Sequence, residues 1–383
     1  MIGHPAKEAL VALGKQYPQL GQIVDEVAFG KMARSGSWPA EYLLPKHVWM
    51  GLYSYMENVP PEAIMHDAAL HKNKVEELRI LGTWGKTQGI YRFDPSLMEE
   101  LIASPLEGDL PAALLRKLPE WAIYIELNQI SFLGDMRCRG AWVMNDFAMD
   151  NSESQHELSL LFDIDSPAGR KLPVVAAVTL PLGSWSLDAV MAKYRAASLS
   201  LIDDPIARGM GLQIDAIEAN ATVDDLARVT RAILSLTLFI ATQNDIQGNS
   251  GDRPTRPEPR RTKTGTRLFS PSNPQVWEVG VRMGGELRRA KELLATPDGV
   301  PGAGGALRPH LRRPHWHSYR VGPRKTEDGE TISADQRDLV VHFIPSLQVN
   351  FAPGMRREDL PAVVHRVRTP KDQAHDDSAA PGR

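Results

Sequence analysis

Histidines, arginines and aromatic residues gather in one short stretch of the chain, RPHLRRPHWHSYRVG at 308–322. Arginines bind phosphates, aromatic rings stack on bases, and histidines titrate near neutral pH or bind metal ions. We therefore weigh a metal site, a nucleic-acid surface, a catalytic cluster and an ordinary strand. The candidate residues for contact with nucleic acid or the ribosome are Arg308, His310, Arg312, Arg313, His315, Trp316, His317, Tyr319 and Arg320.

The metal interpretation depends on the spacing of His315 and His317, which a strand would place on one face. Another ligand would have to come from His310 or His342. The arginines around these histidines disfavour a divalent cation, so we predict neither a metal ion nor a cofactor. A match to single-stranded nucleic acid is physically better, because guanidinium groups meet phosphates while the rings stack on bases.

Other residue patterns offer weaker catalytic chemistry. Cys138 lies between two arginines that could lower the pKa of its thiol, but strand alternation explains the same pattern. Asp163 and Asp165 in FDIDSP resemble a two-carboxylate magnesium site, although such pairs are common where strands end. The chain has no Gly-X-Ser-X-Gly elbow and no phosphate-binding loop of the Walker type. We therefore assign no catalytic residue, and the interpretation leans away from an enzyme.

The composition describes a folded protein rather than a disordered or fibrous one. Apolar residues make up 42% of the chain and charged residues 24%, near the averages for globular proteins. A length of 383 residues is enough for more than one domain. The formal charge of −3 argues against a surface built entirely for nucleic acid. A single cysteine excludes an internal disulfide, and no segment is long and apolar enough for a membrane span. We expect a cytoplasmic protein without a membrane partner.

Hydrophobic periodicity predicts an α+β fold. Helices broken by prolines fill the first hundred or so residues, and alternating segments from 120 to 182 predict a mainly antiparallel central sheet. Helices are expected at 186–199 and at 222–243, the second beginning at Thr222 as its cap. The stretch 275–295 places Val279, Met283 and Leu287 on one helical stripe.

Composition shifts divide the chain into regions. The segment 249–265 is rich in proline and arginine and is interpreted as a linker or exposed loop. The predicted regions are a helical N-terminal region at 1–110, an α+β central domain at 111–248, the basic linker at 249–265, a smaller α+β C-terminal domain with the basic aromatic strand at 266–352, and a disordered tail at 353–383.

Several motifs in order resemble one known family. They are LGTWGKTQGIYRFD at 81–94, LPEWAIYIEL at 118–127, SPSNPQVWEVGVRMGGELRR at 270–289, and the histidine-rich stretch itself. Over about residues 75–351 the chain resembles the type V-A anti-CRISPR proteins of the AcrVA-two kind, which mobile genetic elements carry.

The resemblance implies an inhibitor that acts on production of the Cas-twelve-a effector nuclease. It implies recognition of the effector's nascent N-terminal polypeptide and loss of the mRNA being translated, with RNA, the ribosome or a host nuclease as further partners. Because extended peptides dock on sheet edges and apolar pockets, the candidate peptide-binding residues are Trp84, Tyr91, Trp121 and Tyr124. A metal-assisted ribonuclease and a simple RNA-binding module remain as alternatives.

Overall fold

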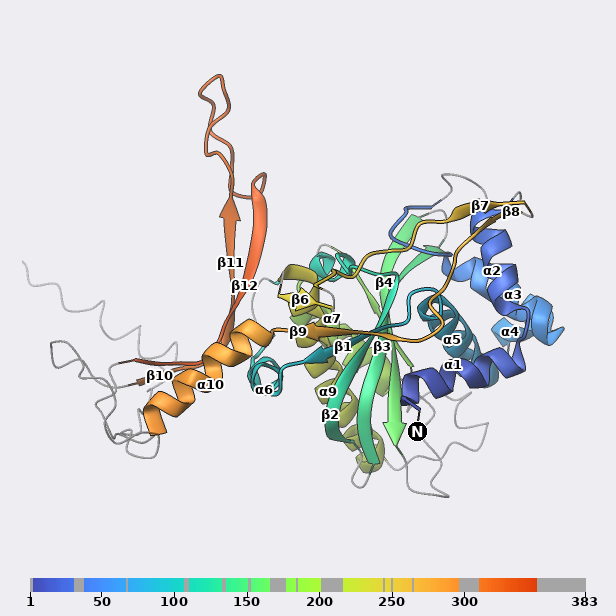
Figure 1. Cartoon of the computed structure of the whole chain (residues 1–383), viewed down its shortest axis with the longest axis horizontal. Helices are drawn as coiled ribbons and strands as arrows, with labels where there is room; N and C mark the ends of the chain where they lie inside the picture. The colour runs from blue at the N-terminus through green and yellow to red at the C-terminus, as the bar shows by residue number, and fades with distance from the viewer. Residues whose placement is uncertain are drawn as a thin grey trace, which may run out of the picture. The chain divides into compact units, whose positions relative to one another are not determined.

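The computed structural model (Figure 1) describes most of the chain and divides it into two compact units. The described residues are 3–30, 38–66, 68–106, 110–132, 136–150, 153–165, 177–183, 185–200, 216–243, 245–248, 251–263, 265–295 and 310–349. The first unit comprises Met1–Arg288 and Arg313–Ser346, and the second comprises Arg289–Arg312 and Leu347–Arg383. The tail at 353–383 lies outside the described residues.

A seven-stranded sheet forms the centre of the first unit, in the order β5-β4-β3-β2-β1-β9-β6. The strands β2 to β5 follow one another along the chain and pair antiparallel, as the alternating segments predict. The strands of this sheet are β1 (Gly89–Phe93), β2 (Ala122–Phe132), β3 (Met136–Asp150), β4 (Glu153–Asp165), β5 (Ala177–Pro181), β6 (Ile246–Gln247) and β9 (Gln275–Val279).

Two pairings in this sheet are parallel. Strand β1 lies between β2 and β9 and runs in the same direction as both. Ile90 is opposite Tyr124 on one side and Val276 on the other. The sheet therefore joins strands from three of the regions that composition separates, because β1 precedes residue 111 and β9 follows residue 265.

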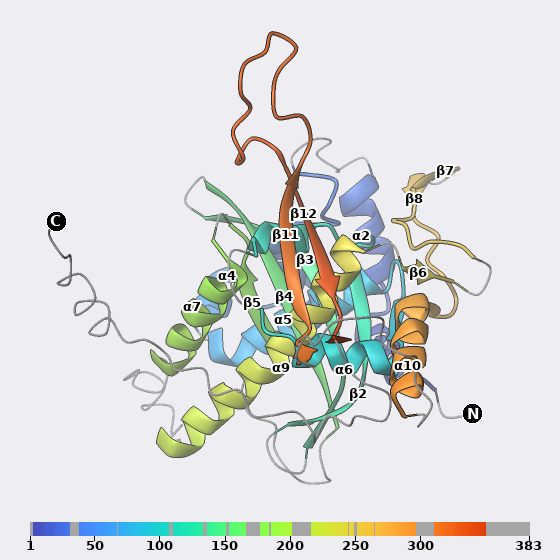
Figure 2. The same cartoon turned by 90° about the vertical axis from the view of Figure 1, so that its left-hand side faces the viewer.

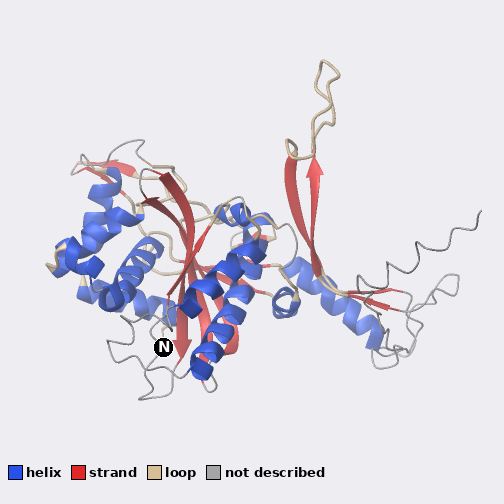
Figure 3. Ribbon diagram, turned by 180° about the vertical axis from the view of Figure 1, so that it is seen from behind, coloured by secondary structure: helices blue, strands red, loops and turns tan. Residues whose placement is uncertain are grey.

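The N-terminal helices cover one face of the sheet, and Figure 3 shows helices on both sides of the strands. A hydrogen bond from the Ala6 N–H to the His4 side chain caps the first helix, and Pro5 follows at its first position. Trp49, Leu78 and Trp84 are buried against Ile90 and Tyr124 of the sheet. These helices are α1 (Pro5–Gln16), α2 (Leu20–Phe29), α3 (Lys46–Glu57), α4 (Pro61–His66) and α5 (Ala68–Trp84).

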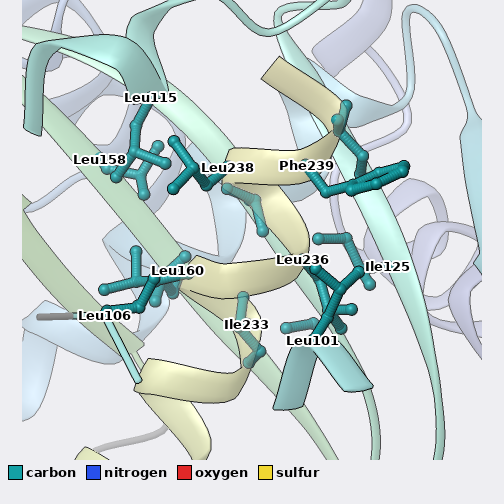
Figure 4. Packing of buried hydrophobic residues seen from close by; sticks show 14 of the residues in the cluster. Leu101, Leu106, Leu115, Ile125, Leu158, Leu160, Ile233, Leu236, Leu238 and Phe239 are labelled. Carbon is teal, nitrogen blue, oxygen red and sulfur yellow. The ribbon is translucent and has the colours of Figure 1, made fainter. Parts of the chain in front are cut away.

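A second helical layer covers the opposite face. Its longest helix, α9, buries Ile233, Leu236 and Phe239 in one cluster with Ile125 of β2 and Leu160 of β4 (Figure 4). Burial of these side chains is the main source of stability of the layer. Its elements are α6 (Pro95–Ala103), the 3₁₀ helix η1 (Ala112–Arg116), α7 (Leu187–Ser200) and α9 (Ala216–Thr242).

In the part of the chain that the structure describes, three short antiparallel pairs lie outside the central sheet. In the first unit, β7 (Arg260–Thr262) pairs with β8 (Gly265–Arg267), and β11 (His315–Val321) pairs with β12 (Asp338–Ile344). In the second unit, β10 (His310–Arg312) pairs with β13 (Leu347–Val349). No helix of the described residues is long and apolar enough to cross a membrane.

Two details of the sequence prediction are wrong. The helix expected to begin at Thr222 begins at Ala216, so Thr222 lies within it and is not its cap. The helix expected over 275–295 is instead strand β9 followed by helix α10 (Val281–Ala295). Gly280 divides them with a φ of +70°, and a Cβ there would lie 1.9 Å from Leu97 Cδ2, so only glycine fits.

The predicted fold class is confirmed. The chain is α+β, with a helical N-terminal region, a central sheet that is mainly antiparallel, and helices and strands in the C-terminal region. What the periodicity does not reveal is the way in which distant strands join one sheet. That joining decides which of the candidate residues become buried.

Candidate functional site

Strands β11 and β12 form a two-stranded hairpin that carries most of the histidine-rich stretch (Figure 2). Directly paired residues share a face of the hairpin, and the register pairs His317 with His342 and Trp316 with Phe343. Alternation along β11 therefore separates the candidate residues into two groups. His315, His317 and Tyr319 lie on one face, and Trp316, Ser318 and Arg320 lie on the other.

The face with Trp316 packs on the core. The ring centroid of Trp316 lies 5.2 Å from that of Phe343, and the Phe343 centroid lies 6.4 Å from that of Phe239 in α9. Phe343 and its neighbour Val341 are buried. Trp316 thus anchors the hairpin to the second helical layer, and we call this face the inner face.

The opposite, outer face presents a row of rings. The Tyr319 ring stacks on His342 with an interplanar angle of 12° and a centroid distance of 5.4 Å. The His317 centroid lies 5.7 Å from the Tyr319 centroid. Tyr319 is 40% exposed, and His317 is exposed. These rings form an accessible surface for stacking or apolar contact.

The two candidate arginines of this hairpin, Arg313 and Arg320, have different surroundings. Both are exposed, but Arg320 within β11 donates a hydrogen bond of 3.0 Å to the carbonyl oxygen of Arg337, whereas Arg313 lies two residues before β11 begins. Arg313 lines a hollow of about 660 Å³ together with Pro314, His315, Ala103 at the end of α6 and Pro105. His315 Nδ1 lies 3.1 Å from the carbonyl oxygen of Arg313. The base of the hairpin is therefore basic and hollowed.

The base of the hairpin is positively charged, whereas its tip carries an excess of acidic residues. From 313 to 344, five basic residues are matched by five acidic residues, so the formal charge is zero with histidine neutral. The charge argument for nucleic acid therefore does not extend over the whole hairpin. The basic residues are Arg313, Arg320, Arg324, Lys325 and Arg337, and the acidic residues are Glu327, Asp328, Glu330, Asp335 and Asp338.

The remaining candidate residues of the stretch do not belong to this hairpin. His310 and Arg312 lie on β10, which belongs to the second unit and pairs with β13. Arg308 lies outside the described residues. Of the nine candidates, the structure brings together those from Arg313 to Arg320.

The four candidate peptide-binding residues are buried, with exposed fractions of 0% for Trp84 and Tyr91, 6% for Trp121 and 1% for Tyr124. Their polar atoms are also bonded within the protein. Trp84 Nε1 donates to the carbonyl oxygen of Gly89 at 2.9 Å, and Trp121 Nε1 donates to that of Ala40 at 3.2 Å. In this structure these side chains contribute to the core rather than to a surface.

The hydroxyls of the two tyrosines are bonded to carboxylates. Tyr91 donates to Glu120 and Tyr124 donates to Asp163, each at 2.8 Å. Burial raises the pKa of Glu120 to about 8. Gly89 lies directly against this carboxyl group, because a Cβ there would be 2.0 Å from Glu120 Oε2. Glu120 is therefore an enclosed acid just before β2, hydrogen-bonded to Tyr91 of β1.

The residues of the weaker catalytic hypotheses have structural partners. Burial raises the pKa of the Cys138 thiol to about 12, which disfavours the nucleophilic thiolate. Asp163 accepts from Tyr124 and from Arg139 Nη2 at 2.7 Å. Among the described residues, no group of three or more histidine, cysteine, aspartate or glutamate side chains is arranged to hold a metal ion.

A second group of cations was not singled out by sequence motifs. The segment interpreted as a linker folds partly into the hairpin of β7 and β8, and Arg260, Arg261 and Lys263 are exposed on it. The sequence does indicate this group of cations, because basic residues outnumber acidic residues in the segment 249–265. Its interpretation as a linker followed from the prolines, which precede the hairpin rather than interrupt it.

Comparisons with known proteins agree on one relationship. A search of curated proteins gives no significant match. A solved structure described as the crystal structure of AcrVA2 is similar in fold, with a TM-score of 0.61 and 19% identity over 91% of this chain and 100% of that chain. Residues 91–351 match the family model AcrVA2-like, described as the anti-CRISPR type V subtype A2 family. Because the match spans most of the chain, the protein belongs to the AcrVA2-like family of anti-CRISPR proteins.

Proposed function

We propose that this anti-CRISPR protein recognises the nascent N-terminal polypeptide of a type V-A effector nuclease, Cas-twelve-a, and lowers the mRNA being translated. Membership of the AcrVA2-like family supports the anti-CRISPR part of the proposal. The resemblance of the motifs supports the mode of action. The protein acts by binding rather than by cleaving RNA itself. Loss of the mRNA then follows from a nuclease that it recruits or from a ribosome that it stalls.

The outer face and free edges of the β11–β12 hairpin carry the proposal that a peptide is bound. Among the described residues, each of these strands pairs with the other and with no further strand, so each keeps one edge on which a strand could be added, although Gln243, directly after α9, donates to the Val341 carbonyl oxygen of β12 at 3.1 Å. An extended peptide can add a strand to such an edge, with main-chain hydrogen bonds providing affinity and side-chain contacts providing specificity. Tyr319 and Val321 are 40% and 37% exposed on the outer face and offer apolar contact.

One observation favours a peptide over RNA at this hairpin, and another favours this hairpin over the peptide site predicted from the sequence. Its formal charge of zero gives little attraction to a phosphate backbone, whereas a mixed charge pattern suits a polypeptide. The alternative peptide site predicted around Trp84 and Tyr124 is enclosed in the core. A nascent chain would therefore meet the hairpin without any opening of the sheet.

The test is a reporter whose message begins with the first codons of the effector, expressed with and without this protein. The wild type lowers the reporter mRNA, and a message with unrelated first codons is unaffected. The double variant His317→Ala and Tyr319→Ala loses the effect, because it removes rings of the outer face while Trp316 still anchors the hairpin.

The matched control is His47→Ala with Tyr55→Ala, which removes the same two side-chain types from exposed positions on α3. This control lowers the reporter as strongly as the wild type does. Unchanged mRNA with the wild-type protein would refute the mode of action. Equal loss of effect in both double variants would refute the assignment to the hairpin.

A further inference from the structure

The hairpin formed by β7 and β8, residues 260–267, concentrates positive charge that the fold does not neutralise. We call it the arginine hairpin. Its cations Arg260, Arg261, Lys263 and Arg267 form no ion pair with any residue that the structure describes. Between 251 and 269, six basic residues face only two acidic ones. The segment therefore carries a local formal charge of +4 in a chain whose net charge is −3.

The register of the arginine hairpin adds a direct repulsion. Arg260 pairs with Arg267, so two guanidinium groups start from directly opposite backbone positions. Like charges placed opposite each other destabilise an antiparallel pair. Arg261 extends from the other face, and Lys263 lies at the turn. An anion placed along the hairpin would relieve this repulsion.

The arginine hairpin is held in place from both sides. Before it, Arg256 is partly buried, and its Nη2 donates to the carbonyl oxygen of Leu118 at 3.0 Å. After it, the buried Leu268 joins the core of the N-terminal helical layer, and β8 packs against α2 (Figures 1 and 2). The cations therefore stand on a supported element, which lowers the entropy lost when a ligand binds.

An exposed aromatic side chain continues the surface. Phe269 follows Leu268 and is 63% exposed, the largest exposure of any phenylalanine among the described residues. Exposed aromatic rings next to a positively charged track are the combination that binds single-stranded nucleic acid, because bases stack on the ring while cations follow the phosphates. An acidic protein partner would be attracted by the positive charges, but its binding would give no role to the exposed ring of Phe269. The combination therefore favours nucleic acid over an acidic protein.

From these observations we propose that the arginine hairpin and Phe269 bind single-stranded RNA through its phosphate backbone and one stacked base. The choice of RNA rather than DNA rests on the proposed function, in which a message is the target. The surface differs from the peptide-binding hairpin in residues and in chemistry. It gives the protein a contact with RNA that is independent of the nascent chain.

The experiment measures binding of a short fluorescent RNA to the purified full chain by anisotropy, over about 0.05 to 0.2 M salt. The triple variant Arg260→Gln, Arg261→Gln and Arg267→Gln binds about a hundredfold more weakly near 0.1 M salt, since each lost phosphate contact removes about 0.7 from the logarithmic salt slope. The slope falls by about 2 in total. Phe269→Ala binds about tenfold more weakly with the slope unchanged.

The matched control is Arg313→Gln, Arg324→Gln and Lys325→Gln, which removes the same charge from the β11–β12 hairpin. It keeps the affinity and slope of the wild type. Absence of RNA binding by the wild type, an equal loss in this control, or preferential binding of an acidic peptide or of DNA with the same sequence would overturn the proposal. Since the assay contains no nascent chain, an inactive reporter with intact RNA binding would refute only the proposed function.

Discussion

The buried carboxyl group of Glu120 provides a sharp test of the electrostatics of this fold. Glu120 is 3% exposed, accepts a hydrogen bond from Tyr91 and lies against Gly89, so water cannot solvate its ionised form. Burial raises its pKa from 4.5 to about 8. The substitution Glu120→Gln keeps the shape and an acceptor for Tyr91 but cannot ionise.

The sign of the effect follows from proton binding in the two states. Between about pH 4.5 and 8 the unfolded chain has released the Glu120 proton while the folded chain retains it, so the free energy of unfolding falls by about 1.4 kcal/mol per pH unit. The stabilisation present below the unfolded pKa is lost as the pH rises through the folded pKa. At pH 7 the accumulated loss is about 3 kcal/mol relative to a side chain that does not titrate.

Urea unfolding of the wild type and of Glu120→Gln, followed from about pH 5 to pH 8, measures this difference. We expect the variant to gain stability over the wild type steadily with rising pH, whatever constant offset the amide introduces. Tyr91→Phe, which removes the donor and keeps the ring, leaves a pH dependence of the same direction. Parallel curves for wild type and Glu120→Gln would refute the assignment of a raised pKa.

Other substitutions test the buried contacts in the same unfolding assay or by labelling. Arg79→Ala leaves Glu76 and Asp146 buried without their cation, and we expect a loss of about 3 to 5 kcal/mol. The exposed Arg195→Ala should cost less than about 1 kcal/mol, and equal losses would contradict the reasoning. Trp316→Ala should cost about 2 kcal/mol, whereas Tyr319→Ala should stay within about 0.5 kcal/mol, since only Trp316 packs on the core. The Cys138 thiol should resist alkylation near neutral pH until the protein unfolds, and rapid labelling of the folded protein would contradict its burial.

Local pattern predicts individual elements well and their partners poorly. Alternation identifies β2 to β5 because each strand pairs with its neighbour in sequence, so register and direction follow from short connections. The pairing of β1 with β9 joins Ile90 to Val276, and no local signal encodes so distant a contact. The prediction of one helix over 275–295 is wrong because the chain changes from strand β9 to helix α10 at Gly280, whose φ is positive.

The candidate site shows the same division between pattern and context. Alternation correctly places His315 and His317 on one face, but it cannot tell which face of the hairpin meets the core. The aromatic residues of β2 mislead for a related reason. A strand covered by helices on both faces buries both sets of side chains, so Tyr124 becomes a core residue despite its polar hydroxyl.

Three of the four motifs that carry the family resemblance contribute strands to the core of the central sheet. The stretches 81–94, 118–127 and 270–289 contain β1, the start of β2, and β9, which are adjacent parallel strands of the central sheet. Distant segments that build one core must keep their shapes compatible, so similarity there follows from the fold. The outer face of β11–β12, part of which lies in the fourth motif, and the arginine hairpin carry exposed side chains that packing of the core does not constrain. Under the proposed function, exchanging the β11–β12 hairpin between relatives with different targets should therefore change the message that is lowered without changing the stability of the sheet.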